Sequence, residues 1–145
     1  MSDPFDTHQG EIPQGYRDIL EKRSFGHLAT IGPSGFPHNS PVWLDHEDGK
    51  NVLINTLEGR QKERNLRRDP RAMISVIDPE DPYRYLAVRG SATLEVDGAT
   101  EHIDSLARKY LDVSEYPHHD KEDGARVIVK IPPEYVIARG RSEAY

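Results

Sequence analysis

The sequence contains no cysteine and only one tryptophan among its 145 residues. Without cysteine, the chain has no disulfide framework, no thiolate metal site and no cysteine nucleophile. No stretch approaches the roughly 20 apolar residues that a membrane-spanning helix needs. The N-terminus, Met1-Ser2-Asp3-Pro4, is acidic and polar, unlike a signal peptide. These absences predict a cytoplasmic protein that does not bind a membrane.

The length and composition are typical of one globular domain. A chain of this size buries roughly 68–70% of its unfolded surface, and 35% of the residues here are hydrophobic. Residues 1–13 contain two prolines and a glycine without hydrophobic periodicity, which predicts a flexible N-terminal arm. Because no repeat or internal boundary follows, residues 14–145 are expected to form a single domain.

The charge is distributed unevenly along the chain. The formal net charge is −6, yet residues 60–71 contain six basic and two acidic side chains and so carry +4. The remaining residues therefore sum to −10. A nucleic-acid-binding protein is normally basic over a whole face, so this isolated basic segment argues against nucleic acid as a partner. It favours a focused site for a small anion.

Hydrophobic spacing and turn residues predict an antiparallel, mainly β fold of the α+β class. Short turns such as Gly32-Pro33-Ser34-Gly35 join successive apolar segments, which is typical of β-hairpins and not of βαβ units. Gly90, within the longest expected strand, predicts a bulge or a close approach of another segment. Six or seven such strands can close as a small barrel, and an α+β sandwich is the alternative. The expected strands cover 25–31, 37–44, 51–56, 72–77, 83–96, 126–131 and 135–138, and the expected helices cover 14–22, 61–68 and 100–111.

The strongest chemical signal is the basic segment itself. A strand end and Gly59 precede a predicted helix whose first turns carry Arg60, Lys62 and Arg64. The free N–H groups and the dipole of a helix start favour an anion, and cationic side chains add charge-assisted hydrogen bonds. Lys62 lies about 160° around a helix from the other two, so all three reach one phosphate only if the helix begins near Arg60. The alternative is a solvated basic helix.

Other polar clusters give no comparable pattern. His118-His119-Asp120 lies in an acidic loop without the fixed spacing of a metal site, so we expect a solvated loop and no bound metal. His38 and Ser40 have no orienting carboxylate nearby in the sequence, which argues against a nucleophilic dyad. No side chain is therefore assigned a catalytic role.

Two motifs together resemble a known family. The first runs Leu28-Ala29-Thr30-Ile31, Gly35-x-Pro37 and Ser40-Pro41-Val42-Trp43. The second runs Arg60-x-Lys62-x-Arg64-Asn65-Leu66-Arg67-Arg68-Asp69-Pro70-Arg71. In this order they resemble the pyridoxamine-5'-phosphate-oxidase-like split β-barrel flavoproteins, and they are most similar to the branch that uses the deazaflavin coenzyme F420. The resemblance covers residues 16–140.

The resemblance implies a split β-barrel of the FMN-binding type, a homodimer, and cofactor sites at the subunit interface. The residues that match the family's phosphate clamp are Arg60, Lys62 and Arg64, with Asn65 beside them. The positions that match its ring-binding strand are His38, Asn39, Ser40, Pro41 and Val42. Some F420-dependent relatives have asparagine at the position of Pro41, and proline excludes a backbone N–H donor there. Trp43 either lines the pocket or packs beneath it.

The resemblance further implies an F420-dependent oxidoreductase that transfers a hydride between reduced F420 and a small organic substrate. The cofactor carries this chemistry, which agrees with the lack of an acid–base constellation in the sequence. Because FMN offers a related ring and a phosphate, an FMN-dependent oxidoreductase is the first alternative. A non-catalytic protein that binds the flavin or deazaflavin is the second.

Overall fold

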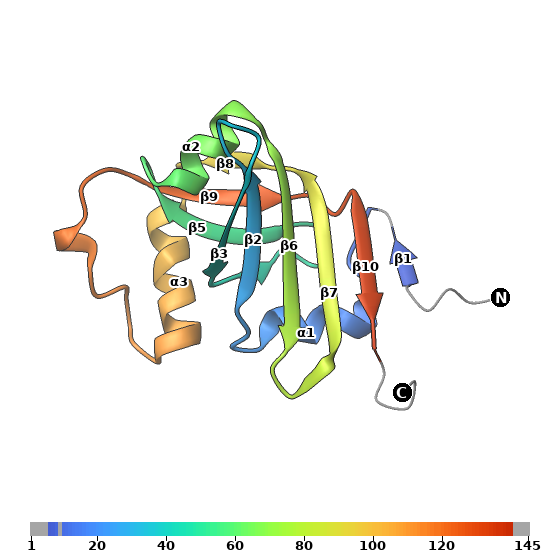
Figure 1. Cartoon of the computed structure of the whole chain (residues 1–145). Coiled ribbons are helices and arrows are strands. Elements are labelled where there is room, and N and C mark those ends of the chain that lie inside the picture. The colour runs from blue at the N-terminus through green and yellow to red at the C-terminus, as the bar shows by residue number, and fades with distance from the viewer. Residues whose placement is uncertain (1–5, 9, 141–145) are drawn as a thin grey trace.

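A computed structural model of the chain describes residues 6–8 and 10–140. Its strands form a six-stranded sheet of order β1-β10-β7-β6-β2-β3 and a four-stranded sheet of order β4-β5-β9-β8 (Figure 1). The strands are β1 (Asp6–His8), β2 (Gly26–Ile31), β3 (Pro37–Val42), β4 (Asp45–His46), β5 (Val52–Leu57), β6 (Arg71–Asp78), β7 (Asp81–Ser91), β8 (Thr93–Glu95), β9 (Arg126–Ile131) and β10 (Tyr135–Arg139). The helices are α1 (Arg17–Glu21), α2 (Gln61–Arg68) and α3 (Ala99–Leu111), with short 3-10 turns η1 (Gln14–Tyr16) and η2 (His119–Lys121).

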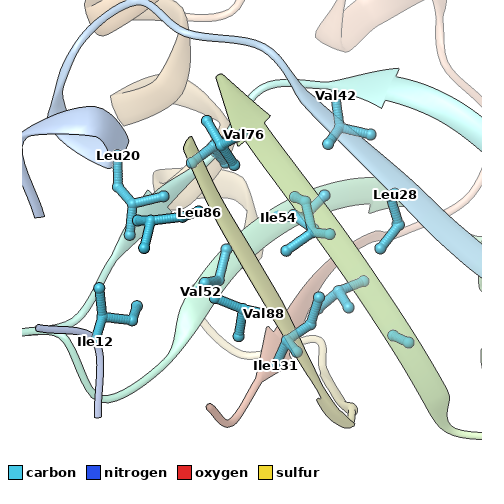
Figure 2. Close-up of a cluster of buried hydrophobic side chains, with 14 of the residues drawn as sticks. Ile12, Leu20, Leu28, Val42, Val52, Ile54, Val76, Leu86, Val88 and Ile131 are labelled. Carbon is cyan, nitrogen blue, oxygen red and sulfur yellow. The ribbon is translucent and has the colours of Figure 1, made fainter. Parts of the chain in front are cut away.

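The inner faces of the two sheets meet in one hydrophobic core. Along β6 every second side chain is buried, which is the period of a strand with one face on the core. Figure 2 shows Val76 and Leu86 of the six-stranded sheet close to Val52 and Ile54 of the four-stranded sheet. All pairings among the described strands are antiparallel. The predicted mainly β, split-barrel fold is confirmed.

The chain passes from one sheet to the other inside the segment 83–96, where the sequence predicted one continuous strand. The segment divides at buried Ala92, because β7 pairs within the six-stranded sheet and β8 within the other. Gly90 pairs in regular register, and the register shift lies at Ile77 instead, so the bulge interpretation of Gly90 is wrong. A Cβ atom at Gly90 would lie 2.1 Å from the Pro132 carbonyl oxygen, which confirms the close approach.

Part of the expected N-terminal arm belongs to the fold. Asp6–His8 pair with β10, and Ile12 is fully buried, with its N–H donating to the Gly49 carbonyl oxygen at 2.8 Å. A three-residue strand and one isolated apolar residue carry no periodicity that a sequence reading could detect. The remainder of the arm, residues 1–5 and 9, and the C-terminal residues 141–145 lie outside the described residues.

Helices α2 and α3 pack against strands of the two sheets. α2 joins β5 to β6 and packs on β2, while α3 packs on β9 and β5. The segment 112–124 follows α3 and projects at the side of the molecule (Figure 1). Over the described part of the chain, no helix combines the length and the apolar character needed to cross a bilayer.

Candidate cofactor site

A cavity of about 250 Å³ lies where the start of α2, the end of β3, α3 and the start of β9 meet. Its apolar lining includes Pro41, Val42, Trp43, Ile103 and Leu106. Its polar lining consists of Asn55, Arg60, Lys62, Tyr116 and Arg126. Four of the predicted site residues, from two separate motifs, therefore line one cavity: Pro41, Val42, Arg60 and Lys62.

The start of α2 places two cations at this cavity. The helix begins at Gln61, and Arg60 precedes it with an extended backbone (φ −67°, ψ 154°). The loop therefore presents Arg60 beside Lys62, which lies in the first turn of the helix. Burial lowers the pKa of Lys62, and the nearby charges of Arg60 and Arg126 lower it further. An ammonium group in such surroundings is stabilised when an anion binds beside it.

The turn into α2 depends on Gly59 and Glu63. Gly59 has a φ of +94°, a conformation that side chains disfavour. Its N–H donates to Glu63 Oε1 at 2.8 Å, and the buried Glu63 carboxylate also accepts a hydrogen bond from Arg67. Arg67 is therefore bonded to Glu63 and does not line the cavity. Arg60 and Lys62 are the cations that this segment presents to the cavity.

Arg126 was not predicted as a site residue. It begins β9 and is 7% exposed, although the next residues of that strand are apolar. Its guanidinium donates to Glu122 Oε1 at 3.0 Å, to Tyr116 Oη at 3.0 Å and to Asn55 Oδ1 at 3.3 Å. The sequence signal that could have selected Arg126 was a charged residue at the start of a buried strand. Its hydrogen-bond partners could not be predicted, because they come from segments that no local pattern connects.

Asn55, the other unpredicted polar residue of the cavity, is held in one orientation. Its Oδ1 accepts from Arg126, and its Nδ2 donates to the Ala99 carbonyl oxygen at 2.9 Å. The same Nδ2 lies 3.0 Å from His102 Nδ1, so that ring nitrogen must accept. The proton of neutral His102 therefore sits on Nε2, which is 3.1 Å from Asp45 Oδ1.

Trp43 forms part of an aromatic wall. Its ring stacks on Tyr110 with the centroids 5.2 Å apart and an interplanar angle of 5°. Tyr110 Oη donates to the Ser24 carbonyl oxygen at 2.5 Å and accepts from the Leu44 N–H at 3.1 Å. Burial raises the pKa of Tyr110 to about 12, so the hydroxyl stays protonated. Both alternatives for Trp43 hold, since it packs on Tyr110 and also lines the cavity.

Two predicted clamp residues do not line the cavity. Arg64 Nη2 donates to Gln61 Oε1 at 2.6 Å on the exposed side of α2. Asn65 is fully buried, where it donates to Thr30 Oγ1 at 3.0 Å and accepts from Gln61 Nε2 at 2.7 Å. Asn65 therefore fastens α2 to β2.

The first three residues of the predicted ring-binding strand also lie outside this cavity's lining. Asn39 is exposed, whereas His38 and Ser40 occupy the half-buried side of β3. His38 Nδ1, Ser40 Oγ and Thr56 Oγ1 are buried atoms without a hydrogen-bond partner among the described residues. Because buried polar atoms usually have a partner, these are positions at which a bound polar molecule would find unused hydrogen-bonding capacity.

The segment with His118 and His119 is more ordered than the solvated loop that we expected. His119 Nε2 lies 2.6 Å from Asp104 Oδ1, and the Tyr116 N–H donates to the same oxygen at 2.8 Å. Both imidazole rings contact Tyr116 edge to face. These contacts fasten Tyr116 to α3 beside the cavity. Within the described ranges, no group of three potential metal ligands occurs.

Two antiparallel sheets around one core, with a cationic cavity beside an aromatic wall, define the flavin-binding split β-barrel class. A family model of pyridoxamine 5'-phosphate oxidase matches residues 12–140. The chain belongs to this family.

Solved structures with the same fold include one F420 reductase. That protein is 36% identical, with a TM-score of 0.74, and the match covers 86% of this chain and 98% of the reductase. A conserved hypothetical protein from Mycobacterium tuberculosis is 26% identical, with a TM-score of 0.74 and coverage of 97% and 93%. A HupZ protein of Group A Streptococcus, at 19% identity, a TM-score of 0.65 and coverage of 88% and 93%, shares the fold.

Proposed function

We propose that the protein is an F420-dependent oxidoreductase that transfers a hydride between reduced F420 and a small organic substrate. The observation that carries the proposal is the partly buried position of Lys62 beside the charges of Arg60 and Arg126. Like charges gathered in partly desolvated surroundings are unfavourable in the free protein and become favourable when an anion binds. The similarity to an F420 reductase supports the choice of the deazaflavin.

The residues at the cavity fit a phosphorylated aromatic cofactor. Arg60 and Lys62 would bind its phosphate, and Val42 and Trp43 would contact its ring system. When bound, F420 supplies the hydride-transfer chemistry, so the protein contributes orientation, electrostatics and exclusion of water. Pro41 has no N–H and therefore shapes the wall without donating a backbone hydrogen bond.

We further propose that two copies associate through the outer face of the six-stranded sheet. Met73 and Ile77 on β6 are 37% and 49% exposed there, and Ile137 of β10 points to the same face. A cavity of about 660 Å³ opens on this face beside Arg89, which stacks over the Tyr135 ring at 4.2 Å. In the described part of the chain, no helix lies in front of β6 and β7 (Figure 1). Exposed apolar side chains beside a cavity on one sheet face support an interaction surface there.

Titration of the purified, cofactor-free protein with F420 and with FMN, side by side, tests the proposed function. Trp43 is the only tryptophan of the sequence and lines the cavity, so quenching of its emission reports binding. We expect tighter binding of F420 than of FMN, and oxidation of reduced F420 when a suitable acceptor is added. A preference for FMN would assign the protein to flavin chemistry, and F420 binding without turnover of any acceptor would indicate a cofactor-binding protein. Binding of neither would refute the proposal.

A further inference from the structure

A carboxylate lies behind the polar lining of the cavity, paired with one of the cations that line it. Glu122, in the segment 112–124, accepts hydrogen bonds from Arg126 through both carboxylate oxygens and from Tyr116 Oη at 2.9 Å. Its Oε2 also lies 3.8 Å from Arg60 Nη2. Arg60, Tyr116 and Arg126 all line the cavity, so the negative charge of Glu122 lies directly behind its polar wall.

Glu122 is ionised at neutral pH. Burial alone would raise the pKa of this carboxyl group, but hydrogen bonds from Arg126 and Tyr116 and the charges of Arg126 and Arg60 outweigh burial and lower the pKa. The polar wall therefore combines three cations, Arg60, Lys62 and Arg126, with one anion. Its formal charge is +2, whereas the same wall without the Glu122 charge would carry +3.

This charge has unequal effects on ligands of different charge. The electrostatic effect of Glu122 falls off with distance and is screened by salt, so it acts mainly on the phosphate bound at Arg60 and Lys62, where each added negative charge is penalised equally. The phosphate of FMN is a monoester that is close to a dianion at pH 7. The phosphate of F420 is a diester, because the lactyl-oligoglutamate tail continues beyond it, and a diester carries one charge. Glu122 thus disfavours the FMN phosphate more than the F420 phosphate.

We propose that Glu122 is a specificity-determining residue that sets the charge selectivity of the cavity in favour of a phosphodiester over a phosphomonoester. The inference rests on the proposed function, since it concerns the same cavity and the same phosphate position. Glu122 acts by its negative charge from behind Arg60 and Arg126, and it needs no direct contact with the ligand.

The test is the substitution Glu122→Gln, which removes the charge while the amide oxygen can still accept a hydrogen bond from Arg126. The probes are FMN, riboflavin, F420 and the phosphate-free deazaflavin chromophore of F420, each titrated against Trp43 emission. At the separations found in a partly exposed cavity, one unit charge changes affinity by about fivefold per ligand charge. We expect F420 to bind about fivefold more tightly and FMN about 25-fold more tightly, so that F420-over-FMN selectivity falls about fivefold. The two phosphate-free ligands should bind as they do to the wild type.

Glu115→Gln is the control variant for net charge. It makes the same change in net charge as Glu122→Gln at an exposed position of the same segment, so it should leave the selectivity unchanged.

The possible failures are distinguishable. If the wild type binds F420 and FMN no more tightly than their phosphate-free counterparts, the phosphate site and the proposed function both fail. If the wild type prefers the phosphorylated ligands and Glu122→Gln leaves the F420-to-FMN ratio unchanged, only the role of Glu122 fails. Weaker binding of both phosphorylated ligands to Glu122→Gln would also overturn this role, because Glu122 would then serve only to hold Arg126 in place.

Discussion

Replacement of Lys62 by methionine should change ligand affinity and protein stability in opposite directions. Methionine keeps an unbranched, flexible side chain of similar length while it removes the ammonium group. A hydrogen bond to a charged group contributes about 1.5–3 kcal/mol. The dissociation constant for the phosphorylated cofactor should therefore rise about 10- to 150-fold.

The free protein should become more stable with the same substitution. The pKa of Lys62 is lowered by burial and by the charges of Arg60 and Arg126, which means that its positive charge is unfavourable in the folded, ligand-free chain. Removal of that charge relieves both effects. A residue retained for packing alone would show the opposite sign, since its loss would lower stability.

Two measurements on one sample check the pair of effects. Quenching of Trp43 emission gives the dissociation constant, and urea unfolding at neutral pH gives the free energy of unfolding. Arg64→Gln is the matched control, because Arg64 lies on the same helix at an exposed position outside the cavity. An unchanged dissociation constant, or a less stable free protein, would refute the assignment of Lys62 to the phosphate.

Three further predictions follow from other parts of the structure. Burial lowers the pKa of Lys109 from 10.5 to about 8. Above pH 8 the unfolded chain therefore binds more protons than the folded chain, and the stability of the folded chain rises with pH. From pH 8 to 10 the free energy of unfolding of the wild type, measured by urea unfolding, should rise by about 2 kcal/mol relative to that of Lys109→Met. Asn65→Ala removes the side-chain amide that donates a hydrogen bond to the buried Thr30 hydroxyl. In the same assay it should lower the free energy of unfolding by about 1–3 kcal/mol, while the affinity for F420 stays unchanged. Ile137→Glu places a charge on the outer sheet face and should give a monomer by light scattering; a dimer would refute the proposed interface.

The sequence predicted those elements whose signals are local. The helix expected over 61–68 is α2, because Asp69-Pro70 ends it, and the strand expected over 126–131 is β9. The two-residue strand β4 is too short to show a period. The break at Ala92 was missed since periodicity tells which residues of a strand are buried but not which sheet buries them.

Only part of the site was predicted, because only some of its residues belong to a local motif. Arg60 and Lys62 stand in one short motif, so charge and helix geometry were enough to select them. Arg126 and Asn55 reach the cavity from β9 and β5, and they are neighbours only because those strands pair, with Asn55 opposite Ile128. Arg64 shares the basic motif, but its position on the far side of the helix depends on where α2 begins.

The cations at the cavity are arranged differently from the cations that stabilise this fold. Arg84 is paired with two carboxylates, Asp18 at 2.7 Å and Asp78 at 2.9 Å, as expected for a half-buried structural charge. Lys62 forms no ion pair with any carboxylate in the described ranges and lies near two further positive charges, with only Glu122 to offset them. The three cations at the cavity share one carboxylate and so keep a net positive charge, which has a cost in stability in the ligand-free protein. The cost is recovered when an anion binds, because a ligand that binds only the folded state adds its binding free energy to the stability of that state.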